Sequence, residues 1–164
     1  MPCRKQTSLV KAETGNLCRV ILLLLLSAVQ CHANAADLLG EGLWARASPP
    51  GAPNGVAYGR LTNAGPEALE IVGLASLAAR TVQIHETFLQ DDMMRMRRID
   101  PVTLQPGESV TLQPGGKHFM LIGISQPLRG GEEVLVDVSM ASSEVVTLTI
   151  PVLPPGETGP EFDQ

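Results

Sequence analysis

Residues 81–99 read TVQIHETFLQDDMMRMRRI, two runs rich in strand-forming residues joined by a pair of aspartates. β-Branched and aromatic residues favour strands, and Asp-Asp between two such runs indicates a tight turn. A two-residue loop would set the pairing of the two strands as Gln90 with Met93, Thr87 with Met96, and His85 with Arg98. The stretch therefore predicts a β-hairpin in which His85 and Met96 lie on one face as diagonal neighbours.

The neighbouring methionines are sorted by the same alternation of side chains. Met94 lies on the face of His85 but further from it, and Met93 points away. Met96 is therefore the favoured partner of His85, with Met94 as a nearby alternative. A shift of one residue in the register would reverse that choice.

The rest of the chain has the same pattern of short apolar runs separated by Gly and Pro. No segment shows sustained helical periodicity. Together these features predict a single all-β domain, a Greek-key sandwich or barrel. The expected strands are residues 56–62, 68–74, 81–89, 93–99, 110–112, 118–124, 134–140 and 145–152.

The N-terminal segment has the three parts of a secretory signal peptide. Basic residues precede an apolar run at 20–26, and Ala33-Asn34-Ala35 supplies small residues for cleavage after Ala35. The apolar run ends at Val29, short of the roughly 20 residues that a membrane-spanning helix needs. A lipid anchor at Cys31 is the alternative, although the residues before it match a lipidation sequence poorly. We expect a signal peptide at 1–35, a β domain at 36–153 and a disordered tail at 154–164.

Charge and cysteine content exclude several functions for residues 36–164. The leader takes four of the twelve basic and one of the seventeen acidic residues, which leaves eight basic against sixteen acidic, a net charge of −8. Nucleic acids and anionic membranes favour basic surfaces, so neither is an expected partner. All three cysteines precede the cleavage site, which excludes a thiolate nucleophile, a redox Cys pair, a Cys-type zinc site and a His-His-Cys copper centre.

A second pair of metal-ligand residues follows in His118-Phe119-Met120-Leu121. His118 and Met120 share one strand face, while Phe119 and Leu121 point to the other, toward the core. Bringing this strand beside the hairpin would assemble His85, Met96, His118 and Met120. Two imidazoles and two thioethers, without carboxylate or thiolate, favour copper and Cu(I) first.

Each of these residue types also has a plainer explanation. Met is a common core filler, and a single His on a strand is usually a packed or solvated residue. We assign Met140 to the core, Met93 to the surface and His32 to the leader. A metal site is favoured for the other four because they share one face.

The spacing of the four residues, His, ten residues, Met, twenty-one residues, His, one residue, Met, resembles the motif of the PCuAC-type periplasmic copper chaperones. Similarity extends over about residues 37–152, including Trp44-Ala45-Arg46-Ala47-Ser48-Pro49-Pro50-Gly51 and Pro114-Gly115-Gly116-Lys117-His118. The resemblance implies a cupredoxin-like fold and a periplasmic Cu(I) carrier, with the metal held by His85, Met96, His118 and Met120. It also implies delivery of copper to the copper-bearing subunit of cytochrome c oxidase, sometimes alongside Sco-type proteins. A monomer is expected.

Two departures from the family pattern bear on function. Some members have Met directly after the first His, where this chain has Glu86. Some carry a His- and Met-rich extension proposed to bind Cu(II), and the tail at 154–164 holds neither residue. No catalytic triad or paired acid site is evident, so we expect a binding protein and not an enzyme. The alternatives are a copper-dependent redox or electron-transfer protein, and an exported β-sandwich adhesion or assembly module without metal.

Overall fold

The computed structural model describes residues 37–160 and 162, and in this part of the chain the regular structure is entirely β. The predicted leader and Cys31 lie outside the described residues. None of the described segments forms a helix that is long and apolar enough to cross a membrane. Ten strands are present: β1 (Leu38–Arg46), β2 (Asn54–Asn63), β3 (Leu69–Ala75), β4 (Ala79–Gln90), β5 (Met93–Arg98), β6 (Val102–Leu104), β7 (Ser109–Leu112), β8 (Lys117–Ile124), β9 (Glu133–Met140) and β10 (Val145–Leu153).

The eight predicted strands are confirmed, with ends that shift by no more than about two residues, the usual uncertainty of strand and helix limits. Two strands were not predicted. β6 has only three residues and lies between Pro101 and Pro106, so it is too short to show a pattern. β1 contains Gly40 and Gly42, and its pairing with β2 is interrupted between Glu41 and Trp44, which breaks the alternation.

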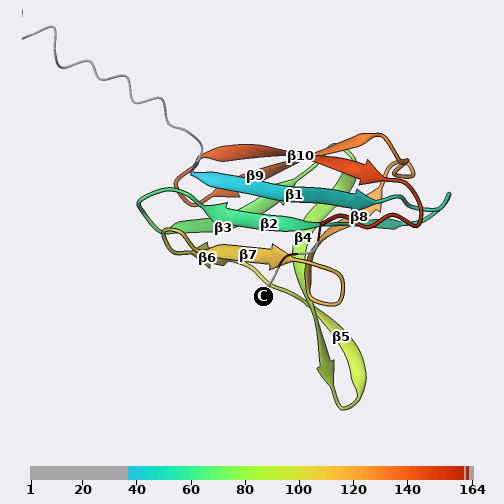
Figure 1. The fold of residues 1–164 in the computed structure, drawn as a ribbon, viewed down its shortest axis with the longest axis horizontal. Coiled ribbons are helices and arrows are strands. Elements are labelled where there is room, and N and C mark those ends of the chain that lie inside the picture. Colours follow the sequence, from blue (N-terminus) through green and yellow to red (C-terminus); the bar gives the residue numbers. More distant parts are fainter. Residues whose placement is uncertain (1–36, 161, 163–164) are drawn as a thin grey trace, which may run out of the picture. The chain divides into compact units, whose positions relative to one another are not determined.

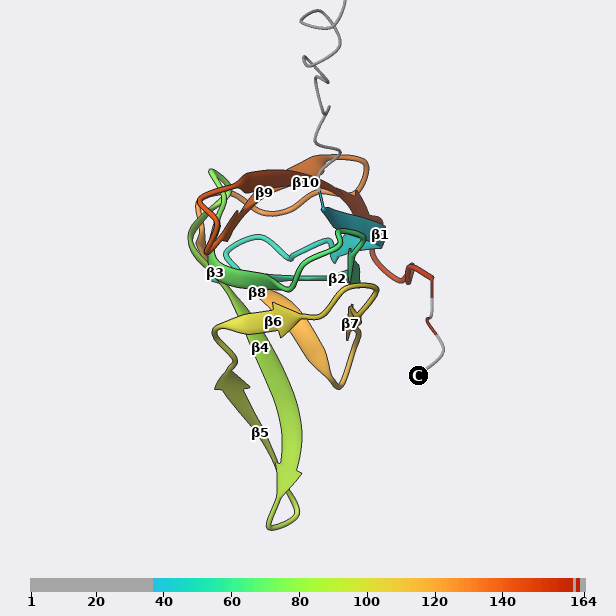
Figure 2. The same ribbon diagram turned by 90° about the vertical axis from the view of Figure 1, so that its left-hand side faces the viewer.

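The strands follow the hydrogen-bonded order β5-β4-β8-β2-β1-β10-β9-β3-β6. β7 is off this path and pairs with the C-terminal part of β2, whereas β8 pairs with its N-terminal part. β1 pairs with both β2 and β10, so it joins the two layers that are visible in Figures 1 and 2. Strands β9 and β10 alternate buried and exposed residues over most of their length, as expected for strands with one face on a core. Buried Val, Leu, Ile and Phe side chains from both layers form one continuous core.

The β4–β5 hairpin projects from this body as an arm (Figures 1 and 2). Its observed pairing is the predicted one, from Gln90 with Met93 at the tip to His85 with Arg98 at the base. Asp91 and Asp92 have φ values of 52° and 58°. Positive φ at both loop residues defines the type I′ turn that suits the twist of a two-residue hairpin.

Part of the C-terminal tail lies against the body. The Arg60 guanidinium carbon is 4.5 Å from the centre of the Phe162 ring. Gly159 packs so closely on Trp44 that an added Cβ would fall 2.1 Å from the indole ring. The described tail residues therefore cover Trp44, which is only 3% exposed.

The arm offers a test of its turn geometry. Replacing Asp92 with Gly removes the side chain from a left-handed residue and should stabilise the hairpin by about 1 kcal/mol. The expected result is slower amide hydrogen exchange in β5. Ser143→Gly is the matched control, because Ser143 has a φ of 73° in the β9–β10 turn; it should leave β5 exchange unchanged. Equal exchange of β5 in wild type and Asp92→Gly would contradict the expectation.

Candidate metal centre

The pairing of β4 with β8 places the two histidines side by side. His85 lies directly opposite His118, and their ring centres are 6.1 Å apart in an edge-to-face arrangement. The adjacent pair, Ile84 and Phe119, faces the core, where both side chains are buried. Because neighbouring positions alternate between faces, the register that fills the core also brings the two imidazoles together on the opposite face.

His118 is oriented by the turn that precedes β8. Gln113-Pro114-Gly115-Gly116 is closed by a 3.0 Å bond from the Gly116 N–H to the Gln113 carbonyl, with Gly115 at φ 81°. Pro followed by a residue of positive φ is typical of a type II turn. The Gly116 carbonyl accepts a hydrogen bond from His118 Nδ1 at 3.2 Å. Since Nδ1 donates, the lone pair of the ring lies on Nε2, which is free to bind a metal.

His85 is oriented by its neighbour on the same strand face. His85 Nε2 lies 2.8 Å from Gln83 Oε1, an atom that can only accept, so Nε2 carries the proton. The lone pair is then on Nδ1, which is buried and has no hydrogen-bond partner among the described residues. Buried polar atoms normally have partners. A metal bound to Nδ1 would supply that missing interaction, so the histidine arrangement fits a metal ion.

The two methionines extend this face in different directions. Met120 lies opposite Gln83 on β4 and opposite Val56 on β2, in the half-buried part of the sheet. Met96 lies opposite Thr87 on the arm and is 53% exposed, whereas His118 is 5% exposed. The strand registers thus place all four predicted residues on one face, with Met96 on its exposed side.

An aromatic row continues from the histidines across the sheet. Tyr58 lies 6.4 Å from His118, measured between ring centres, and 4.6 Å from Trp44. Burial raises the pKa of Tyr58, so its hydroxyl stays protonated at neutral pH. Tyr58 therefore lies beside His118, and Trp44 packs against Tyr58 from β1.

The electrostatic environment favours neutral imidazole at His85. Burial lowers its pKa, and the neighbouring His118 and Arg98 lower it further. Arg98 lies directly opposite His85 and forms an ion pair with Asp100. Metal binding needs an unprotonated ring nitrogen, and the lowered pKa keeps one available on His85 near neutral pH.

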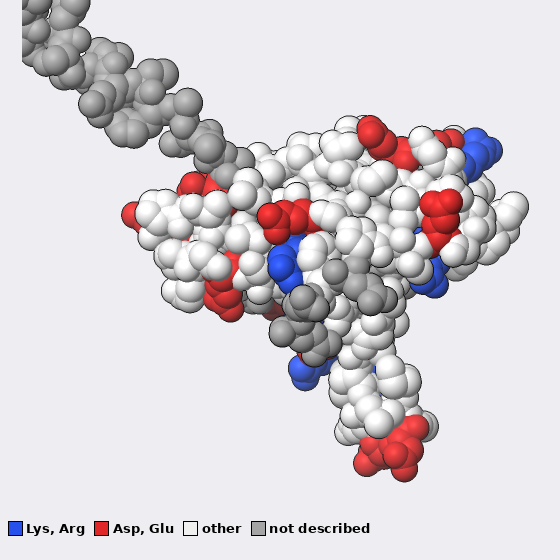
Figure 3. All heavy atoms as spheres, viewed as in Figure 1, with Lys and Arg blue, Asp and Glu red and all other residues white. Residues whose placement is uncertain are grey.

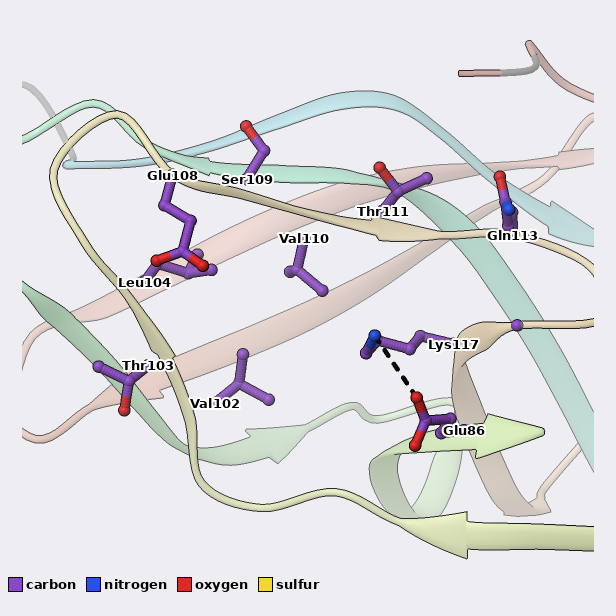
Figure 4. Close-up of a pocket in the computed structure, with 11 residues that line it drawn as sticks. Glu86, Val102, Thr103, Leu104, Glu108, Ser109, Val110, Thr111, Gln113 and Lys117 are labelled. Atoms are coloured by element: carbon purple, nitrogen blue, oxygen red, sulfur yellow. Dashed lines mark ion pairs between the residues drawn. The ribbon is translucent and has the colours of Figure 1, made fainter. Parts of the chain in front are cut away.

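Glu86, the residue that departs from the family pattern, points to the other face of the sheet. One of its carboxylate oxygens accepts hydrogen bonds from Arg97, and the other lies 3.5 Å from Lys117 Nζ. Figure 4 shows the pair with Lys117 at one end of a cavity of about 500 Å³ beneath β6 and β7. None of the four candidate ligands lines this cavity. A Met at position 86 would therefore lie on the opposite face from His85.

Among the described residues, no group of three or more His, Cys, Asp or Glu side chains is arranged to hold a metal ion. The four residues predicted from the sequence would combine thioether sulfur with imidazole. Soft donors of this kind suit Cu(I).

The residues that orient the two histidines were not predicted from the sequence. Gln83 lies two residues before His85, so strand alternation could have placed it on the same face. Tyr58 comes from a strand 60 residues away from His118, and only the β2–β8 register brings them together. The hydrogen bond from His118 to the Gly116 carbonyl depends on the geometry of the turn at residues 113–116.

The fold is shared with copper-binding domains of known structure. The copper-bound PCuAC domain from PmoF2 superposes with a TM-score of 0.60 and 26% identity, over 73% of this chain and 94% of that domain. The CuI form of DR1885 from Deinococcus radiodurans gives a TM-score of 0.56 and 26% identity, over 80% and 88% of the two chains. The prediction of a cupredoxin-like all-β domain is confirmed.

Sequence comparison assigns the family. Residues 41–152 match the family described as "Putative lipoprotein LpqE-like", and the protein belongs to this family. A relative from Leifsonia xyli subsp. xyli (strain CTCB07), described as "Putative lipoprotein Lxx21020", is 29% identical over 110 residues. The matched region covers 66% of this chain and 65% of that relative, somewhat less than two thirds of its length.

The lowered pKa of His85 predicts a pH dependence of stability. The folded protein takes up a proton at His85 less readily than the unfolded chain, whose reference pKa is 6.5. This contribution to the free energy of unfolding is therefore present above pH 6.5 and is lost as the pH falls through 6.5 toward the lower folded value. Urea unfolding of the metal-free protein at pH 7.5 and 5.0 should show a smaller loss of stability in His85→Gln than in wild type. Identical losses would contradict the assignment.

Proposed function

We propose that the protein is an exported Cu(I)-binding chaperone whose cargo is held by His85, Met96, His118 and Met120. The main support for this proposal is the His85–His118 pair. One nitrogen of each ring donates a hydrogen bond to a protein acceptor, and the other nitrogen is left for a metal. Similarity to copper-bound PCuAC domains supports copper as that metal.

The donor set supports a carrier in preference to a resident catalytic centre. Neutral imidazole and thioether ligands bind Cu(I) without adding negative charge, and each can be replaced individually by a ligand from a partner. Met96 is half exposed, so a partner can approach the metal from the arm. The proposed activity is therefore transfer of Cu(I) by ligand exchange, with no chemical turnover.

The recipient and the location extend this proposal. The family resemblance supports the copper-bearing subunit of cytochrome c oxidase as the recipient, with Sco-type proteins as further partners. It also supports a periplasmic location. The description of the matching family as lipoproteins supports export. It also favours lipidation at Cys31, whereas the residues around Ala35 favour cleavage there; the proposed β domain remains intact in both cases.

The first test is a Cu(I) titration of residues 36–164 against a chromophoric chelator. Wild type should bind one equivalent tightly. His85→Ala should weaken binding by more than the about 10- to 100-fold that is typical for residues that only orient a ligand. Met120→Leu should weaken binding in the same direction, because it removes sulfur while it preserves an apolar side chain of similar size.

Met93→Leu is the matched control for this titration. Met93 is on the arm and 54% exposed, but its side chain points away from the histidine face. Its substitution should leave the affinity unchanged. Absence of Cu(I) binding by wild type, or binding that His85→Ala and Met120→Leu leave intact, would refute the proposed function.

A second test addresses the orientation of His85. Gln83→Leu removes the acceptor that fixes His85 Nε2–H. Residues in this position relative to a metal ligand contribute about 10- to 100-fold to affinity. The Cu(I) affinity should fall by that factor while the circular dichroism spectrum stays that of wild type. An unchanged affinity would show that the hydrogen bond does not prepare the ligand.

A further inference from the structure

The arm concentrates exposed apolar side chains in a small part of the molecule. Nine large hydrophobic residues are exposed among those described, and four of them lie at the outer end of the β4–β5 hairpin: Leu89, Met93, Met94 and Met96. All six residues of β5 are exposed, and β5 ends the sheet order. Isolated exposed hydrophobic residues are normal, but clustered ones mark interaction sites.

The two faces of the arm differ in chemistry. The histidine face carries Met94 and Met96, with Leu89 directly opposite Met94. The other face carries Glu86, Arg95 and Arg97. Arg97 bonds to Glu86 and lies over the Phe88 ring, with its guanidinium carbon 5.0 Å from the ring centre. Figure 3 shows acidic atoms over the tip of the arm, where charge discourages pairing of the open β5 edge with other chains. Met94 and Met96 are thus on the opposite face from Glu86 and Arg97, while Arg98 lies on their face at the base of the arm, opposite His85.

We propose that Met94, together with Met96, forms an outer Cu(I) station through which the metal passes between the histidine pair and a partner protein. This inference rests on the proposed function. Met94 and Met96 are two residues apart on β5, about 6.6 Å along the strand, and long thioether side chains can span part of that distance. Soft donors therefore continue from the half-buried histidine pair toward the tip, and Met94, at 63% exposed, is the outermost on this face.

The transfer step involves ligand exchange only. A bond between copper and a histidine nitrogen breaks as a bond to Met94 sulfur forms, while Met96 stays bound. The metal remains Cu(I), and no electron or proton is transferred. The same step in reverse loads the site, so Met94 should affect the rate of transfer far more than the affinity at equilibrium.

The test compares Met94→Leu with Met93→Leu. Both substitutions replace an exposed thioether by an apolar side chain of similar size, on opposite faces of one strand. Cu(I)-loaded unlabelled protein is mixed with ¹⁵N-labelled metal-free protein of the same variant, and the growth of loaded-form NMR signals gives the transfer rate. Met94→Leu should slow transfer by about tenfold, equivalent to about 1.4 kcal/mol in activation free energy, with an affinity close to that of wild type. Met93→Leu should match wild type.

A direct readout uses protein labelled with ¹³C at the methionine methyl groups. Addition of Cu(I) beyond one equivalent should shift the Met94 methyl signal and leave that of Met93 in place. If wild type binds one equivalent of Cu(I) but Met94→Leu transfers it as fast as Met93→Leu, the outer station is refuted while the proposed function stands. If wild type binds no Cu(I), the proposed function itself fails, and the outer station with it.

Discussion

The register between β4 and β8 is the constraint on which the rest of the candidate centre depends. Val82 opposite Leu121 and Ile84 opposite Phe119 fill the core, and the positions between and beyond them carry Gln83, His85, His118 and Met120. A slip by one residue would move the apolar side chains to the solvent-facing side, at a cost of about 1.5–3 kcal/mol for each large side chain exposed. The hydrophobic core therefore fixes the relative position of the two imidazoles without any metal. The positions of these candidate ligands thus follow from the packing of the core.

Around this register, the centre divides into a rigid and an open half. His118 is buried, tied to Gly116, and packed against Tyr58, which Trp44 supports from β1. Met96 lies on a two-stranded arm, an arrangement that is only marginally stable without support from further strands. A metal held between these halves would be positioned by the body and released through the arm. This asymmetry suits a protein that must hold its cargo and also pass it on.

Much of this centre could be predicted from the local sequence, because strand alternation and one short turn determine most of it. Asp91-Asp92 fixed the hairpin register, and the two-residue spacing of His118 and Met120 fixed their common face. The burial of His118, the contact with Tyr58 and the missing partner of His85 Nδ1 depend on pairing between strands that are distant in sequence. β1 was missed because its glycines and its irregular pairing interrupt the alternation.

The selectivity of the proposed centre depends as much on what is excluded as on the ligands. Glu86, adjacent to His85 in sequence, is held on the opposite face by Arg97 and Lys117, and these contacts also lower its pKa. No carboxylate from this position is then available to a divalent ion such as Zn²⁺ or Cu(II) on the histidine face. Arg98 lies on that face opposite His85 and is paired with Asp100; the repulsion from the positive charge that remains is about twice as large for a dication as for Cu(I). Thioether donors and a nearby guanidinium thus act in the same direction, toward a soft monovalent metal.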